Sequence, residues 1–316
     1  MKVVSSARIK RSLQHEMRGK YPDVHFVFCV SIDEAERDLE DADVLITYGS
    51  HLQAKHIVMA NRLKWIMVIS AGIDRLPREE IEKRQIIVTN ARGIHGVPMA
   101  EYTISMMLNV ARNEKKLFHN EQNKIWDQRV KISEITGKTI AVLGTGAIGK
   151  EIARLAKAFR MKTLGYNRSG KKSEEFDDIY TYNQLMEILA RADFVVSVLP
   201  STEDTKNLIT INHFQAMKKE AVFINIGRGS TVCEDDLVAA LRKEMIAHAV
   251  LDVFQKEPLD RDHPFWEMEN VTVTPHLSGV FPEYQPRAFK IFEHNLRVFL
   301  NGEGELINKV DLKRGY

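Results

Sequence analysis

The sequence predicts an α/β protein built from two parallel sheets, and three observations support this fold class. Short apolar runs rich in β-branched residues alternate with amphipathic segments along the chain, which is the pattern of strands joined by crossover helices. These runs form two series, separated by one long apolar segment. The 316 residues also exceed what a single hydrophobic core usually serves, so two domains are expected.

The two series predict five strands followed by six. The first five strands are expected at residues 1–4, 25–30, 44–48, 65–70 and 86–89. The next six are expected at residues 139–143, 162–166, 194–199, 221–226, 247–253 and 271–274. The helices between them carry start signals of their own. Ser31 can cap the first helical amides, and Glu34, three residues later, can reach back to the amide of Ser31.

Two apolar helices set the predicted domain boundaries. Residues 98–112 have Pro98 at a plausible first helical position and apolar side chains around most of the circumference, so this helix should be a crossover, a dimer contact or both. Residues 289–299 repeat Phe and Leu at helical spacing before Gly302, which predicts a return to the first domain. We therefore expect one domain of residues 1–98 and 285–316 and a second domain of residues 99–284.

Composition excludes several classes of protein. The 45 basic and 43 acidic residues leave a net charge of +2, and no basic stretch is interleaved with aromatics, so nucleic acid is not expected as a partner. Cys29 and Cys233 lack the spacing of a zinc site, and we expect buried thiols and no metal. No run of about 18 apolar residues occurs. The protein is therefore expected in the cytoplasm, away from membranes.

A glycine-rich turn between a predicted strand and a predicted helix indicates dinucleotide binding. The apolar run at residues 139–143 leads into this turn, and a helical pattern follows from residue 150, which is the order of the Rossmann fingerprint. The first glycine permits a tight turn, the second lets the backbone approach a pyrophosphate, and the third lets the helix pack on the strand. The turn consists of Gly144, Thr145, Gly146, Ala147, Ile148 and Gly149.

The end of the next strand favours NADP over NAD. An NAD enzyme usually has an acidic residue about 20 residues after the glycines to bind the ribose hydroxyls. Here the strand ends in Asn167, Arg168 and Ser169. Arg168 and Ser169 can hold a 2′-phosphate through a charge-assisted bond and a hydroxyl donor. NAD remains the alternative if Arg168 is a solvated cation and Asn167 binds the ribose.

Three side chains follow predicted strands at positions suited to redox chemistry. Arg228, Glu257 and His276 come after the strands expected at 221–226, 247–253 and 271–274. Ligands of parallel sheets bind outside the carboxyl ends of the strands. A histidine is suited to general acid work near neutral pH, and a carboxylate beside it orients its ring. Each residue alone is equally consistent with a surface charge or a turn residue.

The segments that contain these residues resemble the signatures of the D-isomer-specific 2-hydroxyacid dehydrogenases. The similarity covers residues 224–229, 251–259 and 274–279 and extends to residues 70–74, 88–93, 143–149 and 199–205. It spans most of the chain in the expected order. The resemblance implies two Rossmann-like or flavodoxin-like lobes and a homodimer formed through the helix region after Pro98.

The resemblance also implies roles for individual residues. Arg228 would bind the substrate carboxylate and carbonyl, His276 would be the acid or base, and Glu257 would pair with His276. Asp252 would accept a hydrogen bond from the nicotinamide carboxamide. The loop that contains Leu199, Pro200 and Thr205 would lie beneath the nicotinamide. Backbone amides near the substrate carboxylate would come from Gly49, Ser50, Ala71 and Gly72, where small residues allow close approach. Tyr48 and His51 flank the first of these loops and are either specificity or packing residues.

The resemblance implies hydride transfer between NADPH and a small 2-oxo acid. The chain lacks an acidic residue near Asn167, and in this it resembles the NADPH-dependent glyoxylate/hydroxypyruvate reductase branch. Glyoxylate, hydroxypyruvate and pyruvate are therefore the expected substrates. The end of the sequence at Tyr316 is not expected to leave room for the regulatory domain of many phosphoglycerate dehydrogenases. Two alternatives remain open: a dinucleotide-sensing corepressor-like binding protein, and an NAD-dependent dehydrogenase of a bulkier acid.

Overall fold

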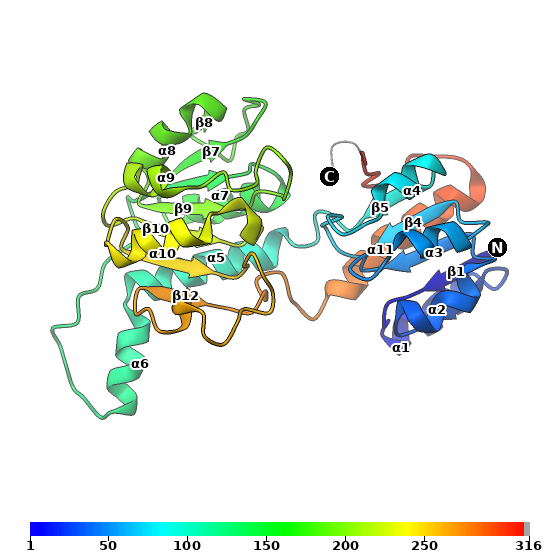
Figure 1. The fold of residues 1–316 in the computed structure, drawn as a ribbon, viewed down its shortest axis with the longest axis horizontal. Helices are drawn as coiled ribbons and strands as arrows, with labels where there is room; N and C mark the ends of the chain where they lie inside the picture. The colour runs from blue at the N-terminus through cyan, green and yellow to red at the C-terminus, as the bar shows by residue number, and fades with distance from the viewer. Residues whose placement is uncertain (313–316) are drawn as a thin grey trace. The chain divides into compact units, whose positions relative to one another are not determined.

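The computed structural model describes residues 1–312 and divides into two compact units (Figure 1). One unit contains Met1–Ile94 and Phe281–Tyr316, and the other contains His95–Val280. Residues 313–316, which the predicted domain of residues 285–316 includes, lie outside the described residues. The first division falls slightly earlier than predicted, because the helix predicted from Pro98 starts at Gly96, and the second falls at residue 281 instead of 285.

The first unit is a five-stranded parallel sheet in the order β2-β1-β3-β4-β5. This is the flavodoxin-like strand order. The strands are β1 (Lys2–Ser5), β2 (His25–Phe28), β3 (Val44–Thr47), β4 (Trp65–Val68) and β5 (Ile87–Asn90). One face packs on α2 (Ile32–Leu39), α3 (Ala54–Met59) and α4 (Arg78–Lys83), and the other on α1 (Arg11–Lys20) and α11 (Tyr284–Asn301).

Helix α11 completes the first unit from the far end of the chain. Its Phe292 stacks on Trp65 of β4 with ring centroids 5.4 Å apart, and Phe289 and Leu296 are buried in the same core cluster. The helix ends at Gly302, whose φ of 72° is left-handed, as the C-cap of a helix commonly requires. This confirms the return predicted from the Phe and Leu spacing.

The second unit is a seven-stranded parallel sheet in the order β12-β11-β10-β9-β6-β7-β8. Its first six strands in chain order are arranged 3-2-1-4-5-6, which is the Rossmann order, and the order reverses between β6 and β9. The strands are β6 (Thr139–Leu143), β7 (Lys162–Tyr166), β8 (Asp178–Tyr180), β9 (Phe194–Ser197), β10 (Val222–Asn225), β11 (His248–Leu251) and β12 (Val271–Val273). The predicted fold class is confirmed, although β8 was not among the six strands predicted.

Helices cover both faces of the second sheet. Side chains of one face, such as Val142, Val196 and Ile224, pack on α5 (Gly96–Ala111) and α7 (Ala147–Ala158). The opposite face packs on α8 (Leu185–Arg191), α9 (Ile211–Ala216) and α10 (Glu234–Arg242). Short 3-10 helices are η1 (Tyr182–Gln184), η2 (Gly229–Thr231) and η3 (Pro264–Trp266).

The start of α5 differs from the sequence prediction. The helix begins at Gly96, so Pro98 occupies its third position rather than its first. The first helical amides have no carbonyl partner within the helix, so a proline in this turn removes no intrahelical hydrogen bond. After α5 comes α6 (Glu114–Gln122), and Figure 1 shows α6 and the following loop extending away from the sheet of this unit. We call residues 114–136 the arm.

Two local predictions are partly right. The Ser31 hydroxyl accepts a hydrogen bond from the Glu34 amide at 3.3 Å, as predicted. The Glu34 carboxylate, however, accepts from the Val30 amide at 2.9 Å rather than from the amide of Ser31. Cys29 is buried as predicted, but Cys233, at the N-cap of α10, is only half-buried.

The structure contains no candidate for a membrane-spanning helix in residues 1–312. None of the helices there combines the length and the apolar character that crossing a bilayer requires.

Candidate active site

The glycine turn joins β6 to α7 at the point where the strand order reverses. Gly144 has a φ of 108°, which a residue with a side chain rarely adopts. A Cβ atom on Gly149 would lie 2.0 Å from the Gly144 carbonyl oxygen, so only glycine lets the helix approach the turn. A Cβ atom on Gly146 would meet no atom within 4 Å. The turn is therefore close-packed against the protein and open on its outer side.

This geometry fits the pyrophosphate of a dinucleotide. Helix α7 already begins at Ala147, inside the turn, so the amides of its first residues have no carbonyl partner in the helix. They supply hydrogen-bond donors and the positive end of the helix dipole. The open side at Gly146 leaves room for the anion. Residues 144–149 thus have the shape and the charge that the predicted cofactor needs.

The loop after β7 is tied to the glycine turn by Asn167. Its side-chain amide donates to the Thr145 hydroxyl at 2.9 Å, and its side-chain oxygen accepts from the Ser169 hydroxyl at 3.2 Å. Arg168 lies 3.7 Å from Asp204, with side chains 70% and 76% exposed. Sequence reasoning missed Asp204, because it follows β9 rather than β7. A phosphate at this position would share the Arg168 guanidinium with that carboxylate.

The loop after β9 is closed by hydroxyl groups. The Thr205 hydroxyl donates to the Pro200 carbonyl oxygen at 2.6 Å and accepts from the Thr202 amide at 2.9 Å. Leu199 is buried at the start of this loop. The Ser230 hydroxyl donates to the Ser201 hydroxyl at 2.9 Å, which links the loop to the one after β10. The loop is therefore held at the same sheet edge as the glycine turn.

Arg228 follows β10 on a loop whose backbone is fixed from two sides. The carbonyl oxygen of Arg228 accepts from the Asn225 side-chain amide at 3.1 Å and from the Thr231 hydroxyl at 2.7 Å. A Cβ atom on Gly229 would lie 2.0 Å from the Phe254 carbonyl carbon. The loop is thus pressed against the segment that follows β11. This packing fixes the backbone position from which the Arg228 side chain extends.

His276 and Glu257 form the predicted pair. His276 Nδ1 lies 2.9 Å from Glu257 Oε2, and the second oxygen of Glu257 accepts from the Phe254 amide at 3.1 Å. Because a carboxylate only accepts, Nδ1 carries the hydrogen of this bond. The His276 side chain is 53% exposed. The pairing leaves Nε2 as the ring nitrogen that can exchange a proton with a ligand.

Asp252 is fully buried at the end of β11. Oδ1 accepts from the Thr274 hydroxyl at 2.6 Å and from the Leu277 amide at 2.8 Å, and Oδ2 accepts from the Ser278 amide at 2.9 Å. These bonds hold the loop that carries His276. A bond to the nicotinamide carboxamide stays a prediction. Sequence reasoning missed this structural role of Asp252. The only sign of it in the sequence is the polar Thr274 at the end of an apolar strand.

His95, at the N-cap of α5, also belongs to this region. A Cβ atom on Gly279 would lie 3.2 Å from the His95 ring, so the ring packs against the loop that carries His276. Burial, and then the positive charge of Arg228, lower the pKa of His95 to about 4. The imidazole is therefore neutral near pH 7 and adds no charge beside Arg228.

The predicted substrate loops lie together at the carboxyl ends of β3 and β4 in the first unit. The Ser70 hydroxyl lies 3.3 Å from the Tyr48 carbonyl oxygen and 3.1 Å from that of Gly72, so its one hydrogen is within reach of both loops. The Gly49 amide donates to the Thr47 hydroxyl at 3.0 Å, so this predicted donor already has a partner. The Tyr48 hydroxyl accepts from Gln285 of α11 at 3.2 Å. Ser50, His51, Ala71 and Gly72 complete these loops.

The glycine turn at the switch point and the His–Glu pair at the same sheet edge define a dinucleotide-dependent oxidoreductase. A family model for the D-isomer specific 2-hydroxyacid dehydrogenase NAD binding domain matches residues 104–278, more than half of the chain. The chain belongs to the D-isomer specific 2-hydroxyacid dehydrogenase family. It is an NAD(P)-dependent enzyme of that family.

Known relatives agree with this assignment along nearly the whole chain. A glyoxylate reductase of Aeropyrum pernix is 32% identical over 284 residues, which cover 86% of this chain and 85% of that protein. A family member from Aeromonas salmonicida has a solved structure with a TM-score of 0.88 and 32% identity, covering 98% and 99% of the two chains. An NADPH-dependent glyoxylate/hydroxypyruvate reductase from Sinorhizobium meliloti, solved with NADP and sulfate, has a TM-score of 0.85 at 26% identity, covering 100% and 99%.

Proposed function

We propose that this enzyme uses NADPH to reduce a small 2-oxo acid to the D-2-hydroxy acid. The observation that carries the proposal is the 2.9 Å pair of His276 and Glu257 at the same sheet edge as the glycine turn and Arg228. An acid, an orienting carboxylate and a guanidinium are the groups that reduction of a 2-oxo acid requires besides a hydride donor.

The residues of the site divide the proposed reaction among them. Residues 144–149 bind the cofactor pyrophosphate, and the bound dihydronicotinamide supplies the hydride for the substrate carbon. Glu257 orients the His276 ring, and Nε2 donates a proton to the carbonyl oxygen. Arg228 binds the substrate carboxylate and stabilises the negative charge that develops on that oxygen.

Glyoxylate, hydroxypyruvate and pyruvate are the proposed substrates. The named relatives from Aeropyrum pernix and Sinorhizobium meliloti support the first two, since their names state glyoxylate and glyoxylate/hydroxypyruvate reduction. NADPH is the proposed cofactor because Arg168 and Ser169 follow β7 where an NAD enzyme has a carboxylate. The ion pair of Arg168 with Asp204 is exposed and weak, so a phosphate can displace it.

Initial rates at 340 nm with NADPH and with NADH, each against a panel of 2-oxo acids, test the proposal. We expect kcat/KM to be highest for the three small acids and higher with NADPH than with NADH. Arg168→Ala should lower kcat/KM for NADPH by about tenfold and leave the value for NADH nearly unchanged, because a charge-assisted bond to phosphate is lost. A protein that binds NADPH but reduces none of the acids would be a sensor instead.

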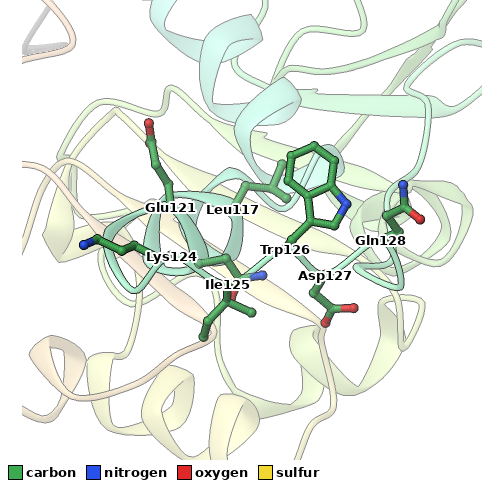
Figure 2. A pocket seen from close by; sticks show the side chains of 8 residues that line it. Leu117, Glu121, Lys124, Ile125, Trp126, Asp127 and Gln128 are labelled. Atoms are coloured by element: carbon green, nitrogen blue, oxygen red, sulfur yellow. The ribbon is translucent and has the colours of Figure 1, made fainter.

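We further propose that the protein forms a homodimer through the arm. Apolar side chains of the arm are strongly exposed, including Phe118 (56%), Trp126 (90%) and Ile132 (50%). Figure 2 shows Leu117, Ile125 and Trp126 around one pocket at the end of α6. Exposed apolar groups gathered on one segment are typical of a protein interface, and aromatic residues are enriched there. A second copy presents the same surface, as a twofold dimer requires.

Charged substitutions in the arm should produce monomers. Phe118→Lys combined with Trp126→Glu places charges where apolar surface would be buried, and we expect the mass measured by light scattering after gel filtration to fall from two chains to one. Tyr182→Glu is the matched control, because Tyr182 is 67% exposed in the same unit but outside the arm. A double variant that keeps the dimer mass would show that the arm is not the interface.

A further inference from the structure

The backbone of His276 has a conformation that is uncommon for a residue with a side chain. Its φ is 55°, in the left-handed region, which few residues other than glycine occupy, although histidine is found there more often than most. Such a conformation persists only where the surrounding structure holds it. The backbone conformation of His276 determines the direction in which its imidazole projects. The contacts that hold this loop therefore also determine how His276 aligns with Glu257.

Asp252 holds the loop on both sides of His276. Its side chain accepts from the Thr274 hydroxyl before His276 and from the Leu277 and Ser278 amides after it. Its main-chain carbonyl oxygen accepts from the His276 amide itself at 2.9 Å. Four hydrogen bonds to one buried residue therefore fix the backbone on either side of the proposed acid.

A tyrosine of α5 continues this set of bonds. The Tyr102 hydroxyl lies 2.7 Å from the Thr274 hydroxyl. Thr274 has one hydroxyl hydrogen and gives it to Asp252, so the hydrogen of the second bond comes from Tyr102. Burial raises the pKa of Tyr102 to about 12, which keeps that hydrogen in place near pH 7. The bonds run in one direction, from Tyr102 through Thr274 to Asp252.

We propose that Thr274 and Tyr102 are positioning residues, which through Asp252 hold His276 in the alignment needed for proton transfer. The inference rests on the proposed role of His276. Neither hydroxyl takes part in the chemistry. Loss of either should therefore lower the rate of turnover without a matching loss of cofactor or substrate binding, since misplacement of a reacting group acts mainly on the chemical step.

Three variants of the full-length protein test this proposal. Thr274→Val keeps the side-chain shape and removes the hydroxyl, and we expect kcat to fall about 10- to 100-fold while KM and the dissociation constant of NADPH stay within about twofold. Thr274→Ser restores the hydroxyl and should recover most of kcat. Tyr102→Phe leaves the Thr274–Asp252 bond intact and should give a smaller loss of kcat than Thr274→Val.

Thr163→Val is the matched control for general destabilisation. Thr163 is fully buried in the same unit, and its hydroxyl also donates to a carboxylate, that of Asp177 at 3.1 Å. We expect this variant to lower Tm and leave kcat unchanged. Equal kcat in Thr163→Val and Thr274→Val, or no recovery in Thr274→Ser, would overturn the inference. Measuring His276→Ala in parallel separates the two proposals, because wild-type turnover in that variant overturns the proposed function itself.

Discussion

His276→Ala should lower kcat by about 10²- to 10⁴-fold, the usual contribution of a general acid, while the dissociation constant of NADPH stays nearly unchanged. The imidazole is the group placed to donate to the carbonyl oxygen, and its partner Glu257 is held by the Phe254 amide. The cofactor loops after β6 and β7 do not depend on the ring. Stopped-flow measurement of NADPH oxidation and fluorescence titration of NADPH binding provide the two values.

His25→Ala is the control for this prediction. His25 is exposed at the start of β2, at the opposite end of the strands from their carboxyl ends, so kcat should not change. Glu257→Gln keeps a hydrogen-bonding group beside His276 but removes the charge, and an intermediate kcat is expected. Normal kcat in His276→Ala would refute the assignment of this residue as the acid.

Arg228→Ala should lower kcat/KM for the 2-oxo acid by about 10²- to 10³-fold, the cost commonly measured when a group that stabilises a developing oxyanion is removed. The guanidinium is proposed to bind both the carboxylate and the reacting oxygen, so KM should rise and kcat should fall together. Initial rates against substrate concentration at saturating NADPH separate these two effects.

Arg228→Lys tests the geometry of the same interaction. Lysine keeps the charge but lacks the planar fork that binds two oxygens at once, so we expect only partial recovery of kcat/KM. Arg154→Ala is the control, because Arg154 is an exposed arginine of α7 that pairs with Glu151. Wild-type kcat/KM in Arg228→Ala would remove this residue from the proposed site.

Much of the fold and the outline of the site were predictable because they depend on local patterns. Strands buried on both faces are continuous apolar runs, and residues that follow such strands necessarily gather at one sheet edge. Arg228, Glu257 and His276 were singled out by this position, and the resemblance to the dehydrogenase family supplied their predicted roles. β8 was missed because Asp178–Tyr180 is a short edge strand that begins with an exposed aspartate, which leaves no apolar run to recognise.

Other features depend on contacts between distant parts of the chain. Tyr102 and Thr274 are 172 residues apart, and Tyr102 appeared in the sequence as one more apolar position of a buried helix. Asp204 lies near Arg168 only because the β7 and β9 loops flank the same turn. No periodicity in the sequence encodes such pairs, since they follow from strand order and helix packing.

The position of α11 in the first unit has a consequence for the order in which the protein assembles on the ribosome. Residues 95–280 form a contiguous unit, so all of its strands and helices have been synthesised before residue 281 is added. In the unit that contains residues 1–94, Trp65 stays uncovered until Phe292 has been synthesised. Until then, one face of its sheet remains partly bare and open to other nascent chains or chaperones. Residues 1–94 are therefore synthesised before residues 95–280 but complete their core after them.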